Sequence, residues 1–398
     1  MRDGPVVNIA VREGDGGDGR VDLGDRLISF EFEDNARKAD KCVITLDNFD
    51  LRFLDDPTWR RGQQLEVSWG YPGNMATPQR VIVKRVSGGI VLRVEGIARS
   101  VLLNQKKKRR AFNNVTRADV VREVAREYGF SGSTLFIEDT DEQFETINQR
   151  NETDAAFLKR LAKKEDFIFY VDAEGLHWES EPFDGKPTHV LTYYTDQGRG
   201  DIISFNLDTD LFKSPGKVTV KGRDHKTKKP FEVTADDNET KRTDLGDELE
   251  VVDERTGATS IQKRMAHETT VHSSAKDEKE AKREANARFR KASRKRMKLK
   301  LQVVGDPTLT AKRVIEVGGL GDYVSGKYFV TMTKHKIQGG YTQDLALKKG
   351  SPAKVPGGAP KSAADKNRAK ASKDQTEMFE KIDERTGAST FHRRPVKG

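Results

Sequence analysis

The chain has 398 residues, of which 34% are apolar and 34% are charged, and its net charge is +9. This length suits two to three domains, but the low apolar fraction indicates small cores, or cores that neighbouring subunits complete. We expect no membrane span, because no run of about eighteen apolar residues occurs, and no signal peptide, so synthesis in a cytoplasm is expected.

Residues 1–104 predict a first, antiparallel β domain. Several short runs place an apolar residue at every second position, which is typical of strands with one buried face. These residues are Ile28, Phe30 and Phe32, then Cys42, Ile44 and Leu46, then Leu65, Val67 and Trp69, then Ile90, Leu92 and Val94. Five or six such strands favour a small barrel. Cys42 is the only cysteine, so an internal disulfide is excluded and a buried thiol is expected.

Residues 105–182 predict an α+β insertion with two capped helices. Thr116 precedes an apolar stripe that ends at Gly129, and Thr153 precedes a second stripe. Asp154 follows Thr153 in the first helical turn, where a carboxylate meets the positive end of the helix dipole. Beyond the second helix, alternating apolar residues on both sides of the turn at 172–175 predict a β-hairpin.

The β pattern resumes in residues 183–230 and 297–350, which predict a second β-barrel domain. Between these segments, residues 231–296 predict an insertion that ends in a long charged helix. The apolar stripe of that helix is thin, so we expect it to pack on another element or another subunit. Residues 351–398 have the composition of a flexible basic tail.

Two basic runs bear on partners. The first is the candidate contact surface Lys106, Lys107, Lys108, Arg109 and Arg110, and the second lies at 288–298. No aromatic residues that could stack on bases are interleaved with them, so nucleic acid is an unlikely ligand and a surface that faces solvent or an acidic partner is favoured.

One six-residue sequence, DERTGA, occurs twice, at 253–258 and at 383–388. The simpler interpretation is a duplicated turn, because Thr-Gly favours one. The alternative hypothesis is that both copies dock on one kind of groove, and the two interpretations have equal weight. The candidate docking residues are Asp253, Arg255, Asp383 and Arg385.

No motif predicts an active site, a metal or a cofactor. Residues 321–327 fit the frame of a phosphate loop, but Tyr328 stands where Ser or Thr is needed, and the following pattern is that of a strand. His267 and His272 are five residues apart, which separates them by roughly 140° on a helix. No nucleophile motif occurs. We therefore expect that the chain is not an enzyme.

Residues 149–162 read QRNETDAAFLKRLA and lead into the strand FIFYVD at 167–172. This pattern resembles the phage late-control D family, which comprises baseplate hubs of contractile tails and is similar to the front half of VgrG proteins. Residues 59–71, 100–130 and 305–342 look like further segments of that family, so the resemblance spans about 1–350. It departs at 165–167, where many relatives have a glycine.

The resemblance implies an α+β, mostly antiparallel β fold with two small tube-protein-like barrels. It also implies a homotrimeric hub, located in the virion tail baseplate and made in the bacterial host, whose quasi-sixfold ring joins the tail tube to a separate central spike. The implied partners are the spike protein, the tube or a tube-initiator protein, the tape-measure protein and other baseplate proteins. A basic nucleic-acid-binding regulator is the alternative function, and a cell-wall hydrolase is the third.

Overall fold

The computed structural model describes most of the chain. The described residues are 4–13, 17–182, 185–193, 200–209, 216–224, 227–236, 248–252, 259–263, 268–273, 275, 277–293, 297–321, 324–349, 376–382 and 389–395. Among them, no helix combines the length and the apolar character that a membrane-spanning segment needs.

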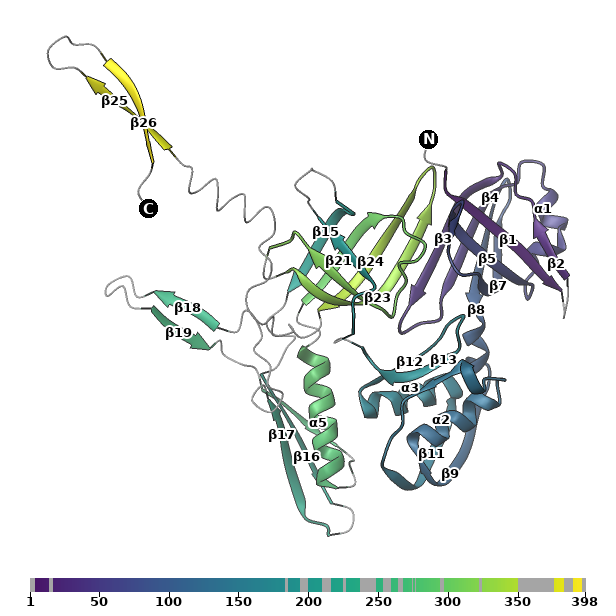
Figure 1. Cartoon of the computed structure of the whole chain (residues 1–398). Helices are drawn as coiled ribbons and strands as arrows, with labels where there is room; N and C mark the ends of the chain where they lie inside the picture. Colours follow the sequence, from purple (N-terminus) through teal and green to yellow (C-terminus); the bar gives the residue numbers. More distant parts are fainter. Residues whose placement is uncertain are drawn as a thin grey trace.

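One 14-stranded sheet dominates the structure (Figure 1). Its first half consists of β1 (Val6–Glu13), β2 (Gly17–Val21), β3 (Leu27–Asn35), β4 (Lys41–Asp47), β5 (Gln64–Tyr71), β6 (Asn74–Met75), β7 (Gln79–Gly88) and β8 (Val91–Ala98). Its second half consists of β14 (His189–Thr192), β15 (Ile202–Thr209), β21 (Met297–Val304), β22 (Val314–Gly318), β23 (Gly326–Ile337) and β24 (Tyr341–Lys349). The pairs are antiparallel except for β14 with β22. The mostly antiparallel fold is therefore confirmed.

The strand order is β15-β21-β24-β23-β3-β4-β8-β7-β5-β1-β2, with β6, β14 and β22 beside this path. The two halves have separate cores, one around Trp69 and one around Tyr328, which fits the expectation of two β portions. The expected closed barrels are not seen, because β15 and β2 end the sheet without pairing with each other in the described part of the chain. The phosphate-loop frame leads into β23, so it is a strand connection.

The two halves join where β3 pairs with β23, which places His335 opposite Phe32. The Trp69 ring stacks on Phe32, with centroids 4.5 Å apart, and lies 4.9 Å from the His335 ring. The Trp69 indole donates to the Tyr341 hydroxyl at 3.2 Å. Because the Gln343 amide and the Tyr341 hydroxyl both donate to Nδ1 of His335, at 2.9 and 2.7 Å, this nitrogen is an acceptor and the ring is neutral.

A buried ionic cluster ties the insertion to both halves of the sheet. Lys312 lies 2.5 Å from Asp34 and 3.6 Å from Asp40, and its ammonium is 4.9 Å from the ring centre of Tyr170 in the insertion. Burial, together with the charge of Asp34, raises the pKa of Asp40 to about 8. At neutral pH the Asp40 carboxyl group therefore keeps a proton that an isolated carboxyl group would have released.

The insertion at 105–182 has a hydrophobic core of its own. It contains β9 (Lys107–Thr116), α2 (Arg117–Arg126), β10 (Leu135–Ile137), β11 (Gln143–Thr153), α3 (Asp154–Glu165), β12 (Phe167–Val171) and β13 (Leu176–Ser180). The side chain of Thr116 caps α2 and that of Thr153 caps α3, as expected. Asp166 ends α3 with a φ of 61°, a left-handed conformation that glycine favours and that Asp tolerates. Short helices α1 (Arg52–Asp55), η1 (Pro57–Trp59), η2 (Arg99–Asn104) and η3 (Gly132–Thr134) complete these regions.

A second small unit contains β16 (Lys217–Arg223), β17 (Pro230–Asp236), β20 (Glu268–His272) and α5 (Glu278–Ser293). The helix packs on β16 and β17 through Ala281, Ala285 and Phe289, so the expectation that it covers another element is confirmed. The boundary predicted at residue 230 is displaced, because β16 pairs with β17 and β20 and not with the large sheet.

Two isolated hairpins complete the structure (Figure 1). The first pairs β18 (Glu248–Val252) with β19 (Thr259–Lys263), and the second pairs β25 (Thr376–Ile382) with β26 (Ser389–Pro395). The second hairpin lies in the tail for which the composition predicts a flexible segment. That composition does not reveal these strands because their apolar residues are few and widely spaced.

We predict that His335 makes the fold less stable at acidic pH. Burial lowers the pKa of His335 to about 4, below its ordinary value near 6.5, so the unfolded chain takes up a proton that the folded chain excludes. The contribution of the neutral His335 ring to the stability of the fold is complete above pH 6.5 and is lost as the pH falls from 6.5 to 4. This difference between the pKa of His335 in the folded chain and in the unfolded chain is equivalent to about 3 kcal/mol in the free energy of unfolding.

Urea unfolding of the wild type and of His335→Gln at pH 7.5 and pH 4.5 measures this effect. Between pH 7.5 and pH 4.5, the free energy of unfolding of the wild type should fall by about 3 kcal/mol more than that of the variant. Replacing the partly exposed His189 by Gln is the control and should leave the wild-type loss unchanged. Equal losses in wild type and His335→Gln would show that the buried ring does not carry the acid sensitivity.

Candidate functional site

The end strand β15 presents an uncovered apolar face. Phe205 lies opposite Leu301 and Leu207 opposite Leu299 across the pair with β21, so these side chains share the face on which Leu299 and Leu301 are buried. Yet Phe205 is 44% exposed and Leu207 36%. The apolar face of the second core thus extends one strand beyond the elements that cover it.

Two more residues enlarge this surface. The ring of Tyr193 meets that of Phe205 edge to face, with centroids 5.1 Å apart, and Ile203, in the bulge of β15, is 49% exposed. Among the described strands, only β21 pairs with β15, so its other edge offers unpaired N–H and C=O groups. We call Tyr193, Ile203, Phe205 and Leu207 the edge surface. An exposed apolar face beside an open strand edge marks an interaction site.

A second apolar surface lies at one end of the first half, where Asn48 holds two loops together. The buried Asn48 side chain donates to the carbonyl of Gly89 at 2.9 Å and accepts from the N–H of Phe53 at 3.0 Å, while its own N–H donates to the carbonyl of Ile90 at 2.7 Å. Large apolar residues project from these loops, and we call them the loop surface: Phe49, Leu51, Leu54, Ile90 and Val91. The strand pattern predicts Ile90 in the core, but Ile90 stands before β8 and is 66% exposed.

The predicted basic contact surface divides into two sets. Lys106, Lys107 and Arg109 are exposed, but Lys108 and Arg110 point to the other face of β9 and are half-buried. Both pair with the fully buried Asp154, which lies 2.7 Å from Lys108 and 2.8 Å from Arg110, and both also pair with Glu127.

The Asp154 carboxylate also accepts hydrogen bonds from Tyr128 at 2.5 Å and from Gln149 at 2.8 Å. Burial alone would favour the neutral acid, but hydrogen bonds from Lys108, Tyr128 and Gln149 outweigh it, so the pKa of Asp154 lies below its ordinary value. Two of the five basic residues therefore hold the insertion together, and the contact surface is reduced to three.

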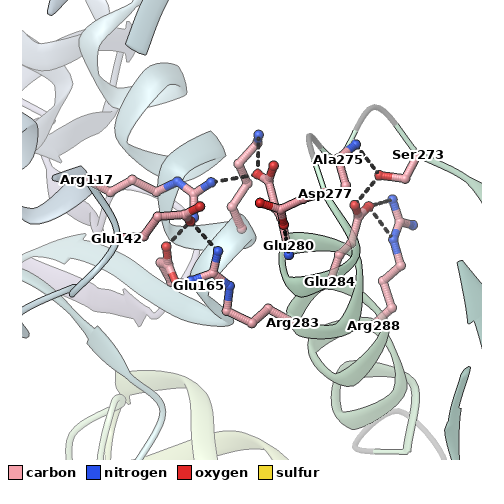
Figure 2. Close-up of polar contacts among 11 residues, drawn as sticks. Arg117, Glu142, Glu165, Ser273, Ala275, Asp277, Glu280, Arg283, Glu284 and Arg288 are labelled. Atoms are coloured by element: carbon pink, nitrogen blue, oxygen red, sulfur yellow. Dashed lines mark hydrogen bonds and ion pairs between the residues drawn. The ribbon is translucent and has the colours of Figure 1, made fainter. Parts of the chain in front are cut away.

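The second basic run is also partly engaged within the chain. Arg288 pairs with Glu284 one turn earlier in α5 at 2.6 Å (Figure 2). Arg290 lies 3.1 Å from Asp166 at the end of α3. Nearby, the buried Arg117 of the insertion binds Glu280 of α5 at 2.9 Å and also contacts Glu165 (Figure 2). The ion pairs of Arg290 with Asp166 and of Arg117 with Glu280 attach α5 to the insertion.

One group has the composition of a cation site. Ligand atoms of Asp172, Glu174 and His177 lie within 4.8 Å of one another. The His177 ring, however, is stacked between Phe136 and Tyr170, and its nitrogens lie 3.2 Å from Asp172 and from Glu179. Burial opposes protonation, but the two carboxylates outweigh it and raise the pKa of His177. Both ring nitrogens are thus engaged by carboxylates and both ring faces by aromatic side chains, which indicates a structural role for His177.

The candidate docking residues Asp253, Arg255, Asp383 and Arg385 lie outside the described residues. The structure describes the strands on both sides of each copy.

We predict that charge reversal of Lys106, Lys107 and Arg109 to Glu leaves the fold intact and impairs assembly at moderate salt. The matched variant, Lys108→Glu with Arg110→Glu, should instead destabilise the insertion by about 3–5 kcal/mol, because it leaves Asp154 buried without a counter-charge. Thermal unfolding separates the two effects, and particle yield reports assembly. An unchanged particle yield with the triple variant would contradict a contact role for these residues.

Comparison with known proteins gives both a family and a fold. The model of the Alg8 N-terminal domain family matches residues 47–339. That description names a domain and no activity. A comparison with curated protein sequences finds no match.

Several solved structures share the fold. The tail protein from Neisseria meningitidis MC58 aligns with a TM-score of 0.63 and 14% identity over 87% of this chain and 96% of that one. The 43 kDa tail protein of prophage MuSo2 from Shewanella oneidensis aligns with a TM-score of 0.61 and 13% identity over 86% and 98%. A type VI secretion system component from E. coli, described as similar to the T4 tail proteins gp27 and gp5, aligns with a TM-score of 0.52 and 13% identity over 87% and 80%. The expected phage-tail fold is thus confirmed, whereas membership of the late-control D family stays a prediction.

Proposed function

We propose that this member of the Alg8 N-terminal domain family is a structural baseplate hub of a contractile tail or a related injection particle, because it has the fold of phage tail proteins. Three copies form a ring that joins the tail tube to a separate central spike. The hub transmits force through its contacts and catalyses no reaction. Its place is the baseplate of the virion tail.

The observation that carries this proposal is the alignment with two tail proteins over 96% and 98% of their own lengths. An alignment of this extent covers whole proteins and not a single shared module. The type VI component adds a third relative in fold from an injection machine. A low apolar content and exposed apolar surfaces also suit a protein whose cores are completed in an assembly.

The ring has a physical basis in two different apolar surfaces. A ring of identical chains needs two complementary surfaces on each copy, because every contact joins one face of a chain to another face of its neighbour. The edge surface on β15 lies in the second half of the sheet, and the loop surface around Asn48 lies in the first half (Figure 1). We place the edge surface of one copy against the loop surface of the next.

The remaining partners follow from the exposed charges. Lys106, Lys107 and Arg109 form a compact positive surface on the insertion, away from the two apolar surfaces in sequence and in fold. Such a surface suits acidic segments of the spike or of the tape-measure protein. The tube, or a tube-initiator protein, contacts the opposite end of the ring.

The ring makes a direct prediction about mass. The purified chain should sediment as a trimer, and Phe205→Glu and Ile90→Glu should each convert it to a monomer. Each substitution buries a charge at the same contact and removes roughly 1–3 kcal/mol of apolar burial at each of three contacts. Asn206→Glu is the matched control, because position 206 lies on the opposite face of β15, and this variant should remain a trimer.

Mixing with the spike protein tests the function itself. The wild-type trimer should capture the spike product encoded beside it, and the two monomeric variants should not. A wild-type chain that stays a monomer and ignores the spike would refute the hub. If the Phe205→Glu variant remains a trimer, the hub proposal stands, but the edge surface is not the contact between copies.

A further inference from the structure

The small unit of β16, β17, β20 and α5, which we call the arm, is attached to the rest of the chain in two ways. Its chain connections, residues 210–216 and 294–296, lead to β15 and β21, which pair with each other at one end of the large sheet. Its second attachment is the contact of α5 with the insertion (Figure 1). The orientation of the arm relative to the insertion therefore depends on this contact.

The helix α5 has an apolar side and a charged side. Its apolar side packs on β16 and β17 and belongs to the core of the arm. The residues of the charged side recur every three or four positions, so they lie on one face of the helix: Glu280, Arg283, Ala287 and Arg290. Ala287 is the one apolar residue among them, so the side that meets the insertion lacks the apolar stripe of a permanent helix contact.

At the beginning of α5, two cations of the insertion bind Glu280. The Glu280 carboxylate lies 2.9 Å from Arg117 and 3.5 Å from Lys164. The Arg117 side chain is 3% exposed and also contacts Glu165, the last residue of α3 (Figure 2). One buried guanidinium thus links a carboxylate of the insertion to a carboxylate of the arm.

Farther along α5, two arginines bind carboxylates of the insertion. Arg283 pairs with Glu142 (Figure 2), and Arg290 lies 3.1 Å from Asp166. These arginine side chains are 42% and 41% exposed, and Nε of Arg283 is buried without a hydrogen-bond partner in the described part of the chain. Each arginine therefore gives up part of its hydration for its ion pair, and the net gain of such a pair is small.

A contact made of charges without a shared apolar core is easily reversed. The cores of the arm and of the insertion have no residue in common in the part of the chain that the structure describes. Removing charges from water costs nearly as much free energy as their attraction returns, whereas apolar burial would give a net gain. Contacts between domains that are not large and apolar permit relative motion of the domains.

We propose that the charged side of α5 is a latch. The arm docks on the insertion through Glu280, Arg283 and Arg290, and it releases from the insertion as a folded unit that pivots on its connections to β15 and β21. The inference concerns a single chain, so it stands or falls independently of the hub.

The distance between two spin labels in the full-length chain measures docking. Arg126→Cys in α2 and Lys279→Cys in α5 provide the labelling sites, because both positions are exposed and outside the latch, whereas Cys42 is fully buried and takes no label. Dilution with unlabelled chain restricts the signal to distances within one chain. We expect one docked distance at about 0.1 M salt and a growing population of longer distances toward about 1 M, where screening is stronger.

Charge substitutions test the latch directly. Arg283→Glu places two carboxylates face to face and should raise the ratio of released to docked chains by roughly 10-fold or more. Adding Glu142→Arg reverses the pair and should restore the docked population. Arg288→Glu is the matched control, because the partner of Arg288 is Glu284 of α5 itself, and docking should be unchanged.

Hydrogen exchange in β16 separates release from unfolding, because its amides stay protected if the arm moves as a folded unit. Loss of this protection together with the docked distance would show that the arm unfolds, which overturns the proposal. A single distance that neither salt nor Arg283→Glu changes would show a rigid joint and would overturn it as well. A double variant that stays released would also contradict the latch.

Discussion

The pairing of β3 with β23 is the constraint on which the architecture depends. It joins residues 27–35 to residues 326–337, so residues 36–325 lie between the two paired strands. The pair is sealed by the contact of Trp69 with His335 and by the hydrogen bonds that Tyr341 and Gln343 donate to this ring. Such a non-local contact makes one sheet of two halves that have separate cores.

Several consequences follow from this single seam. The strands that end the sheet, β15 and β2, belong to different halves. The apolar face of the second core continues onto β15, where its side chains are exposed. The insertion and the unit around α5 lie outside the sheet, where the cluster of Lys312, Asp34 and Asp40 and the ion pairs of Arg117 attach them. Charged contacts thus position the modules, and apolar surfaces remain for neighbouring molecules.

Local features were predictable from the sequence. The caps at Thr116 and Thr153, the buried stripes of both helices and the hairpin after α3 depend on residues close together in the chain, and the structure confirms them. The seam was not predictable, because alternation reveals that Phe30 and Phe32 share a face but not which distant strand they meet. The same limit applies to β16, because its alternating pattern predicts a strand but not the sheet to which the strand belongs.

The candidate site illustrates both the strength and the limit of pattern reading. A strand at 107–116 predicts that basic residues alternate between two faces, but only the fold shows Asp154 beneath Lys108 and Arg110. The sequence predicts strands in residues 183–230, but the exposure of Phe205 and Leu207 appears only when β15 is found at the end of the sheet. The DERTGA repeat is visible in sequence, whereas the strands on both sides of each copy appear only in the structure.

Amide hydrogen exchange of residues 202–209 in the purified assembly is the most direct test of the claim that neighbouring copies complete an open sheet. Amides at an open edge exchange quickly, whereas those covered by a subunit contact are protected. The account predicts that β15 is protected to nearly the level of β21 in the assembly and loses this protection on dissociation. Fast exchange along β15 in the intact assembly would contradict it.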